Sequence, residues 1–133
     1  MVATLTVRGL CVSTGEGQHL LSDVNFTIKP GERVGLIGAS GSGKSLTAGA
    51  LCGLLRPPLR VSEGVIMLDR LNLPDLTPRG WQAVRGRRIF QIFQSPGTAL
   101  TPALRVGRQL AEAARIAGEI PAVALPRALK SVL

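Results

Sequence analysis

The residues of this 133-residue chain best suited to chemistry form one glycine-rich stretch, "GASGSGKS", Gly38 to Ser45. It fits G-x-x-x-x-G-K-[ST] at every fixed position. A phosphate carries dense negative charge and many acceptors, so a loop that wraps it must bring backbone N–H groups close to it. A Cβ at Gly38, Gly41 or Gly43 would hinder that approach or the positive φ it needs. The stretch therefore predicts a phosphate-binding loop.

Within this loop the side chains have different predicted roles. Lys44 should reach the β- and γ-phosphate oxygens of a nucleotide, and Ser45 should place its hydroxyl on a bridging Mg²⁺. The helix after the loop should point its electropositive N-terminus at the same phosphates. A glycine-rich turn without a ligand is the alternative. The predicted nucleotide-binding residues are Gly38, Ala39, Ser40, Gly41, Ser42, Gly43, Lys44 and Ser45.

Two elements must position this loop. Arg33 to Gly38, "RVGLIG", is short and continuously apolar, which is typical of a strand covered on both faces in a parallel sheet. Lys44 to Leu55, "KSLTAGALCGLL", is small or apolar nearly all round and predicts a buried helix that Pro57 and Pro58 end. The loop thus follows a strand pattern and opens a helix, the context that its motif requires.

The rest of the chain predicts strands first and helices later, hence a mixed α/β domain. Alternating apolar residues around Leu5–Val7 and Val24–Ile28 flank the polar "STGEGQ" and indicate a hairpin, and Pro30-Gly31 indicates a turn with positive φ at the glycine. Further predicted elements are a strand at Val61–Asp69, a helix at Thr77–Val84 with Thr77 as cap and Pro78 in its first turn, a strand at Arg87–Phe93, and helices at Leu104–Ala117 and from Ala122 onward.

Net charge is strongly positive, +8, which is typical of proteins with polyanionic partners. The arginines are nevertheless scattered, with only Arg85, Arg87 and Arg88 close together, and no basic run alternates with aromatic residues as a stacking platform for bases requires. A solvated or subunit-facing basic surface is therefore favoured over nucleic-acid binding, which would weaken steeply with salt.

Other residues that could do chemistry have plainer interpretations. Cys11 and Cys52 lack metal-ligand spacing and are expected to be reduced, buried thiols, while His19 in a polar stretch is expected to be a solvated loop residue. No signal-peptide pattern is present, and the longest apolar segment, Leu46 to Leu55, is about half of the ~20 residues a membrane span needs. We expect that the chain itself does not cross a membrane.

The flanks of the loop, "LLSDVNFTIKPGERVGLIGASGSGKSLTAGALCGLL", resemble the start of an ATP-binding subunit of an ATP-binding-cassette (ABC) transporter. "SEGVIMLD" is similar to the strand after the first helix in that family, and "RRIFQIFQSPGTALTP" is similar to its Q-loop region. The pairing of "GSGKSLT" with "FQSPGTALTP" most resembles the branch that serves importers of di- and oligopeptides and of nickel. The resemblance runs from about Leu5 to Ala117.

This resemblance implies an α/β P-loop NTPase core with an N-terminal antiparallel β-subdomain, the chain ending part-way into the α-helical subdomain. Residues 1–31 and 61–73 would form the β part, 32–56 and 77–95 the core, and 102–133 the start of the helical part. It also implies binding of ATP and Mg²⁺, transmembrane permease subunits and a second ATP-binding subunit as partners, a solute-binding protein indirectly, and a peripheral place on the cytoplasmic face of a bacterial inner membrane.

By the same resemblance, Gln94 is the Q-loop glutamine that contacts the attacking water or Mg²⁺. Independently, a side-chain amide at the end of a strand can donate to water or accept at a metal. Gln91 is the competing register, but it lies inside the apolar strand pattern and no Ser-Pro break follows it. A polar strand end is the plainer alternative for Gln94.

The chain departs from the family pattern in several places. The region "CVSTGEG" has no aromatic residue to stack on adenine, and Asp69 is followed by Arg70 where the family favours glycine, so that turn is expected to differ in shape. After Leu104 we find no L-S-G-G-Q signature, no apolar strand ending in aspartate and glutamate, and no late switch histidine, so no catalytic residue of the family is present and the chain is interpreted as an N-terminal half.

Three functions stay open at this point. The first is the ATP-hydrolysing subunit of an importer, represented by its nucleotide-binding half. The second is a truncated, catalytically inactive remnant or interaction module that binds nucleotide or a transporter subunit. The third is another phosphate-loop enzyme, such as a small-molecule kinase or a GTPase, which leaves "FQSPGTALTP" unexplained.

We predict that the 133-residue polypeptide alone has no significant ATPase activity, because the family's catalytic glutamate and switch histidine, which would polarise the attacking water, are not found in it. Phosphate release from the purified chain with Mg-ATP measures this. Turnover that Lys44→Ala abolishes would contradict the prediction.

Overall fold

The computed structural model describes residues 3–95 and 100–117 of the chain. They form two compact units, of which the first ends at Trp81 and the second begins at Gln82, within one helix. The predicted helix from Ala122 onward lies outside the described residues.

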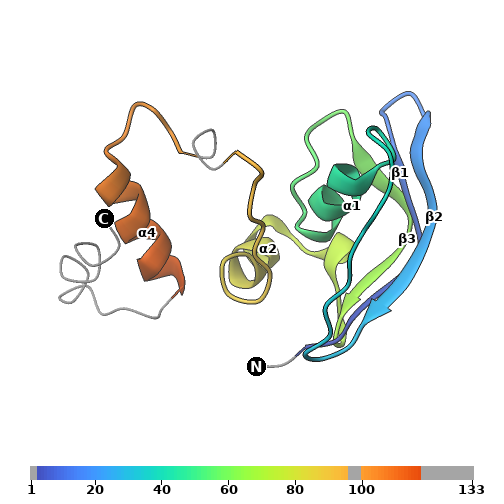
Figure 1. Ribbon diagram of the computed structural model, residues 1–133, viewed down its shortest axis with the longest axis horizontal. Coiled ribbons are helices and arrows are strands. Elements are labelled where there is room, and N and C mark those ends of the chain that lie inside the picture. The colour runs from blue at the N-terminus through green and yellow to red at the C-terminus, as the bar shows by residue number, and fades with distance from the viewer. Residues whose placement is uncertain (1–2, 96–99, 118–133) are drawn as a thin grey trace. The chain divides into compact units, whose positions relative to one another are not determined.

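The first unit is built on an antiparallel sheet of four strands in the order β2-β1-β3-β4 (Figure 1). The predicted hairpin is confirmed: β1 (Leu5–Ser13) pairs with β2 (His19–Ile28). The predicted strand after the first helix is confirmed as β3 (Arg60–Leu68), which pairs with the other side of β1 and with the short β4 (Leu71–Asn72). The antiparallel sheet thus comes from two separate parts of the sequence.

The turn after β2 forms as its dipeptide predicts. Glu32 donates its backbone N–H to Lys29 O at 3.0 Å, which closes a four-residue turn around Pro30 and Gly31. Gly31 has φ 76°, a conformation that favours glycine at this position. The carboxylate of Glu32 accepts the Lys29 N–H at 2.7 Å and fixes the turn from its other end.

One face of the sheet packs against the helix α1 (Lys44–Leu51) (Figure 1). Burial of aliphatic side chains between them is the main stabilising term of this unit, at about 25 cal/mol for each Å² removed from water. Both cysteines are buried and free, as expected. The buried apolar residues of this unit are Val7, Leu10, Cys11, Val12, Leu21, Ala50, Cys52, Ile66, Leu68 and Leu73.

Helix α1 is shorter than the sequence predicts, because it stops at Leu51 and does not run to the prolines. The cause is Gly53, which has φ 61° and donates its N–H to Ala50 O, while Leu54 donates to Gly49 O. These two bonds form a Schellman motif, which satisfies carbonyls that a helix end otherwise leaves unpaired. A glycine that can adopt positive φ ended the helix before Pro57 could.

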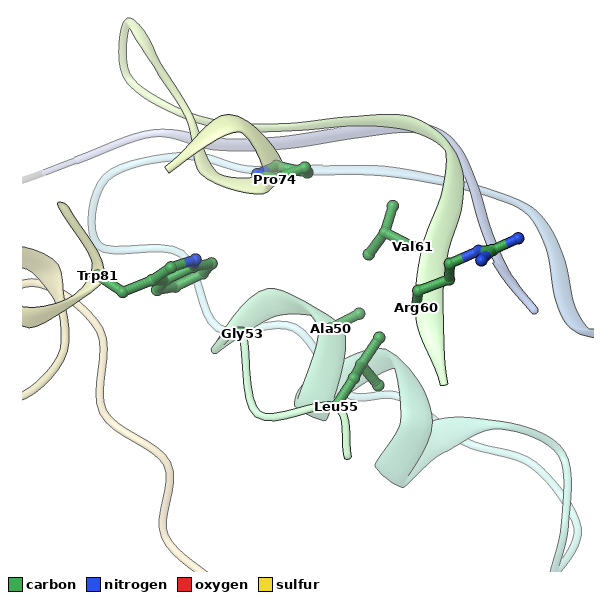
Figure 2. Close-up of a pocket in the computed structure, with 7 residues that line it drawn as sticks. All are labelled: Ala50, Gly53, Leu55, Arg60, Val61, Pro74 and Trp81. Carbon is green, nitrogen blue, oxygen red and sulfur yellow. The ribbon is translucent and has the colours of Figure 1, made fainter. Parts of the chain in front are cut away.

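Gly53 also makes close packing possible at this end of α1. A Cβ built on it would lie 2.5 Å from Cε2 of Trp81, so the indole ring lies directly against the glycine. Figure 2 shows the ring beside a cavity of about 270 Å³, with the Arg60 side chain extending away from it. The cavity is lined by Ala50, Gly53, Leu55, Arg60, Val61, Pro74 and Trp81.

The turn between β3 and β4 has its positive φ on the residue before Arg70. The positive φ falls on Asp69, at 57°, which an aspartate tolerates better than most side chains. Asp69 is held there by Thr4, which donates its N–H to Asp69 Oδ1 at 2.8 Å and accepts the Asp69 N–H at the same distance.

The predicted buried strand at Arg33–Gly38 is wrong for the described part of the chain. This segment has no regular secondary structure, and Val34, Leu36 and Ile37 are 52%, 55% and 95% exposed. The physical reason is that a strand needs a neighbour to accept and donate its backbone hydrogen bonds, and no described strand runs beside it.

The second unit begins within α2 (Pro78–Val84), which starts as predicted, with Gly80 donating its N–H to Thr77 Oγ1 at 3.2 Å. A short 3₁₀ helix, Leu73–Asp75, precedes it in the first unit. The predicted strand Arg87–Phe93 is wrong: only an isolated bridge joins Arg85 to Ile89, and Ile92 is 95% exposed. As for Arg33–Gly38, no described strand pairs with this segment.

The predicted helix at Leu104–Ala117 is confirmed as α4 (Val106–Ala117). Gln109 fixes the segment before it, because its amide accepts from Thr101 N and donates to Thr101 O and Leu104 O at 2.8–3.0 Å. Arg87 donates from Nε to Ile116 O at 3.0 Å, a cation at the helix C-terminus, where the helix dipole favours positive charge.

No helix in the described part of the chain is long and apolar enough to span a bilayer.

We predict that Gly53→Ala destabilises the chain by roughly 2–4 kcal/mol, because the new methyl group would meet the Trp81 ring and the left-handed backbone would be strained. Gly49→Ala is the matched control. Its Cβ would meet Leu55 Cδ2 at an ordinary 3.5 Å, so it should be neutral or stabilise by up to about 1 kcal/mol.

Urea unfolding followed by far-UV circular dichroism measures both changes. Equal unfolding midpoints for the two variants would contradict the prediction.

Candidate functional site: the phosphate loop

The loop Gly38–Ser45 has the backbone that its glycines predict. Gly41 and Gly43 have φ of 79° and 89°, in the left-handed region that side chains with a Cβ rarely adopt. Gly38 meets a different constraint: a Cβ there would lie 2.5 Å from the hydroxyl oxygen of Ser42. The three glycines are therefore required for two separate reasons, backbone conformation and close approach.

Lys44 closes the loop from inside. Its ammonium donates to Gly38 O at 2.7 Å, to Ala39 O at 2.6 Å and to Ser42 Oγ at 3.3 Å. An ammonium has three N–H donors, and these three acceptors match them in number. The side chain is half-buried, and its charge is held at the mouth of the loop.

Backbone N–H groups of the loop are free to meet an anion. Ser42 donates its N–H to Ala39 O at 3.2 Å, whereas no backbone acceptor is recorded within the described residues for the amides of Ser40, Gly41 and Gly43. Helix α1 begins at Lys44, directly after Gly43, and its first turn has no acidic residue. Unpaired amides, the positive end of a helix dipole and an ammonium thus converge on one short segment.

The sheet supports the loop through Leu21. A Cβ on Gly43 would lie 2.8 Å from Leu21 Cδ1, so the start of β2 lies directly against the last loop glycine. From the other side, Thr47 donates its Oγ1–H and its N–H to Gly43 O at 3.0 and 2.8 Å. Leu21 and Thr47 are both buried, and together they fix the entry to α1.

These residues fit the triphosphate of a nucleotide. The glycines allow the positive φ of the loop and the close approach of Ser42, and the amides and Lys44 supply donors and positive charge. Ser45 is exposed at the first turn of α1, where its hydroxyl could serve a hard cation such as Mg²⁺.

Gln94 is described in the second unit, where it is exposed. The strand expected to end at it does not form, so its orientation at a strand end is not realised. Its pairing with the phosphate loop stays a prediction. In the competing register, Gln91 has its Oε1 buried without a hydrogen-bond partner in the described part of the chain.

Two side-chain contacts were not predicted from the sequence, one made by Ser42 and one by His19. Ser42 occupies a variable position of the motif, so nothing in its type or spacing indicated that it would contact Lys44. His19 is not the loop residue expected: it opens β2, and its Nδ1 lies 3.1 Å from Ser13 Oγ. Ser13 is 2% exposed and its hydroxyl is also 2.8 Å from Ser62 Oγ, so the histidine is anchored to a buried group.

The chain matches a known protein-family model over most of its length. The family model described as ABC transporter matches residues 21–132, most of the chain. This chain belongs to the ABC transporter family. Membership of this family implies that the chain binds ATP.

Several curated relatives are similar to this chain. The oligopeptide transport ATP-binding protein OppD of Escherichia coli (strain K12) is 43% identical over 115 residues, covering 83% of this chain and 33% of the relative. The dipeptide transport ATP-binding protein DppD of Lactococcus lactis subsp. cremoris is 40% identical over 92 residues, covering 69% and 26%. The metal-staphylopine import system ATP-binding protein CntD of Staphylococcus aureus (strain NCTC 8325 / PS 47) is 38% identical over 113 residues, covering 84% and 41%.

The chain therefore spans between about a quarter and two fifths of the length of these relatives. A solved bacterial Atm1-family ABC exporter with ATP bound shares the fold, with a TM-score of 0.52 at 21% identity, covering 90% of this chain and 22% of that one. The resemblance to the ABC ATPase family is thus confirmed, with an antiparallel sheet and helices that fit part of such a domain.

We predict that Gly38→Ala weakens ATP binding by roughly 5- to 100-fold, because the added Cβ overlaps Ser42 and forces the loop open at a typical cost of 1–3 kcal/mol. The double variant Gly38→Ala/Ser42→Gly removes both atoms that the Cβ would meet and should recover part of the affinity.

Calorimetric titration measures the ATP affinity of the unchanged chain, the single variant and the double variant. If the double variant binds no better than the single variant, the overlap with Ser42 is not the reason for the glycine.

Proposed function

We propose that this chain is the nucleotide-binding part of an ATP-binding subunit that powers an importer of di- or oligopeptides or of nickel. The observation that carries the proposal is the closed phosphate loop, in which Lys44, unpaired amides and the start of α1 converge. The names of the relatives support the cargo class, since they refer to dipeptide, oligopeptide and metal-staphylopine transport.

In this function the loop binds and orients the triphosphate. Its amides contact the phosphate oxygens, and the Lys44 ammonium neutralises part of their charge while it keeps Gly38 and Ala39 in place. Ser45 would hold Mg²⁺, which when bound offsets the negative charge on the β- and γ-phosphates. The Q-loop role of Gln94, as a contact of Mg²⁺, stays a prediction. Gln94 would also contact the attacking water.

The rest of the proposed assembly follows from the family. Transmembrane permease subunits and a second ATP-binding subunit are the proposed partners, with a solute-binding protein acting on them indirectly. The proposed place is the cytoplasmic face of a bacterial inner membrane, as a peripheral subunit. In the proposed division of the chain, residues 1–31 and 61–73 form the β part, 32–56 and 77–95 the P-loop core, and 102–133 the start of a helical part.

We predict that Lys44→Ala lowers the affinity for Mg-ATP at least tenfold, because it removes the one cation of the loop together with the bonds that close it. Lys29→Ala is the matched control: it removes an equal charge from an exposed position in the turn after β2. Calorimetry with Mg-ATP and with Mg-GTP measures affinity and base preference.

Equal weakening by both substitutions would show a general charge effect and would argue against the loop as the binding site. Preference for GTP would favour a different class of phosphate-loop protein over an ATP-binding subunit.

A further inference from the structure

The cavity beside Trp81 is a concave site of the first unit, at the opposite end of α1 from the phosphate loop. Its volume of about 270 Å³ exceeds the roughly 150 Å³ in which an apolar cavity can hold a benzene-sized molecule. Figure 2 shows the Trp81 ring on one side of the empty centre and Val61 on the other, with Pro74 and Ala50 between them. The cavity can therefore accept one small ring.

Small residues and one indole ring determine what this cavity favours. Ala50 is buried on α1, and Gly53 has no side chain, so the Trp81 ring lies directly against the backbone there. Trp81 is half-buried and forms part of the cavity wall. Aromatic rings pair well with other aromatic rings, in offset-stacked or edge-to-face arrangements. This wall therefore favours a planar aromatic ligand over an aliphatic ligand of equal size.

A free cation lies at the mouth of the cavity. Arg60 lines the cavity and is exposed, and no hydrogen bond or ion pair is recorded for its guanidinium within the described residues. In Figure 2 the side chain extends away from the cavity, so its charge lies outside the apolar space. Exposed side chains change rotamer within nanoseconds, and the guanidinium can therefore turn to a carboxylate held at the mouth.

We propose that this cavity is a binding site for a small aromatic carboxylate, whose ring packs against Trp81 and whose carboxylate meets Arg60 at the mouth. The larger cavity bordered by β2 and α1 has no charged residue in its lining, so a carboxylate has no such partner there. The proposal does not rest on nucleotide binding. A ligand of this size makes few contacts, and we expect a dissociation constant on the order of 1 mM for benzoate.

Fluorescence of the intact chain reports on this cavity directly, because Trp81 is the single tryptophan of the sequence. Benzoate should change the Trp81 emission in a saturable way. Benzamide, which has a similar shape without the charge, should bind about threefold more weakly because it loses the attraction to Arg60. Cyclohexanecarboxylate keeps the charge but has no planar ring to stack on the indole, so it should also bind more weakly. Emission that benzoate leaves unchanged, or equal affinity for all three probes, would overturn the proposal.

Substitutions then test where benzoate binds. Arg60→Gln should weaken binding about threefold, whereas the matched control Arg70→Gln, at an exposed arginine in the turn after β3, should leave it unchanged. Val61→Phe adds a ring to a side chain that faces the cavity and should weaken binding at least about tenfold, with circular dichroism to show that the variant is folded.

The phosphate loop is the other place where an anion could bind, and Lys44→Ala distinguishes the two sites. Benzoate should bind this variant as it binds the unchanged chain. Loss of benzoate binding in Lys44→Ala, or full binding by a folded Val61→Phe variant, would overturn the proposal.

Discussion

The structure of the site depends on the bonds that Lys44 makes inside its own loop. Without a cation at that point, the carbonyls of Gly38 and Ala39 would lose the donor that they share. The ammonium donates to both carbonyls and so holds the loop in a curve. The backbone amides of the loop then remain available to an anion. Of its three contacts, the one to Ser42 is the longest, at 3.3 Å, and is therefore the one that a phosphate oxygen can replace at the lowest cost.

Few contacts connect the closed loop to the rest of the first unit. Gly43 is held between Leu21 on β2 and Thr47 on α1, so the position of the loop is set by where the helix packs on the sheet. The helix in turn ends at a defined residue, because the Schellman bonds around Gly53 and the ring of Trp81 leave it no room to continue. Both ends of α1 are thus fixed by glycines in the left-handed conformation.

The sequence predicted well the features that near neighbours decide. The turn at Pro30-Gly31, the cap at Thr77 and the loop glycines depend on the conformations of a few consecutive residues, and all of them formed. The C-terminus of α1 was predicted too far along the chain. Both Gly53 and Pro57 can end a helix, and Gly53 comes first. The direction of the His19 ring could not be predicted either, because its partner Ser13 is brought to it by strand pairing.

The two strands that failed to form show the limit of the same reasoning. An apolar run predicts that a segment will be buried, but the partner that buries it must come from elsewhere, and neither Arg33–Gly38 nor Arg87–Phe93 has one in the described residues. Near-complete exposure of Ile37 and Ile92 is the result.

The first of these segments still keeps the alternation of a strand. Val34 and Leu36 line a cavity of about 340 Å³ that is bordered by β2 and α1, while Ile37, of opposite parity, is almost fully exposed. Its backbone is held at one end by the turn around Gly31 and at the other by the carbonyl of Gly38, which Lys44 binds. Because the loop is closed by its own lysine and by α1, its curvature does not depend on strand pairing of the segment that leads into it. The proposed capacity to bind an anion is therefore a local property of the loop and does not depend on strand pairing of residues 33–38.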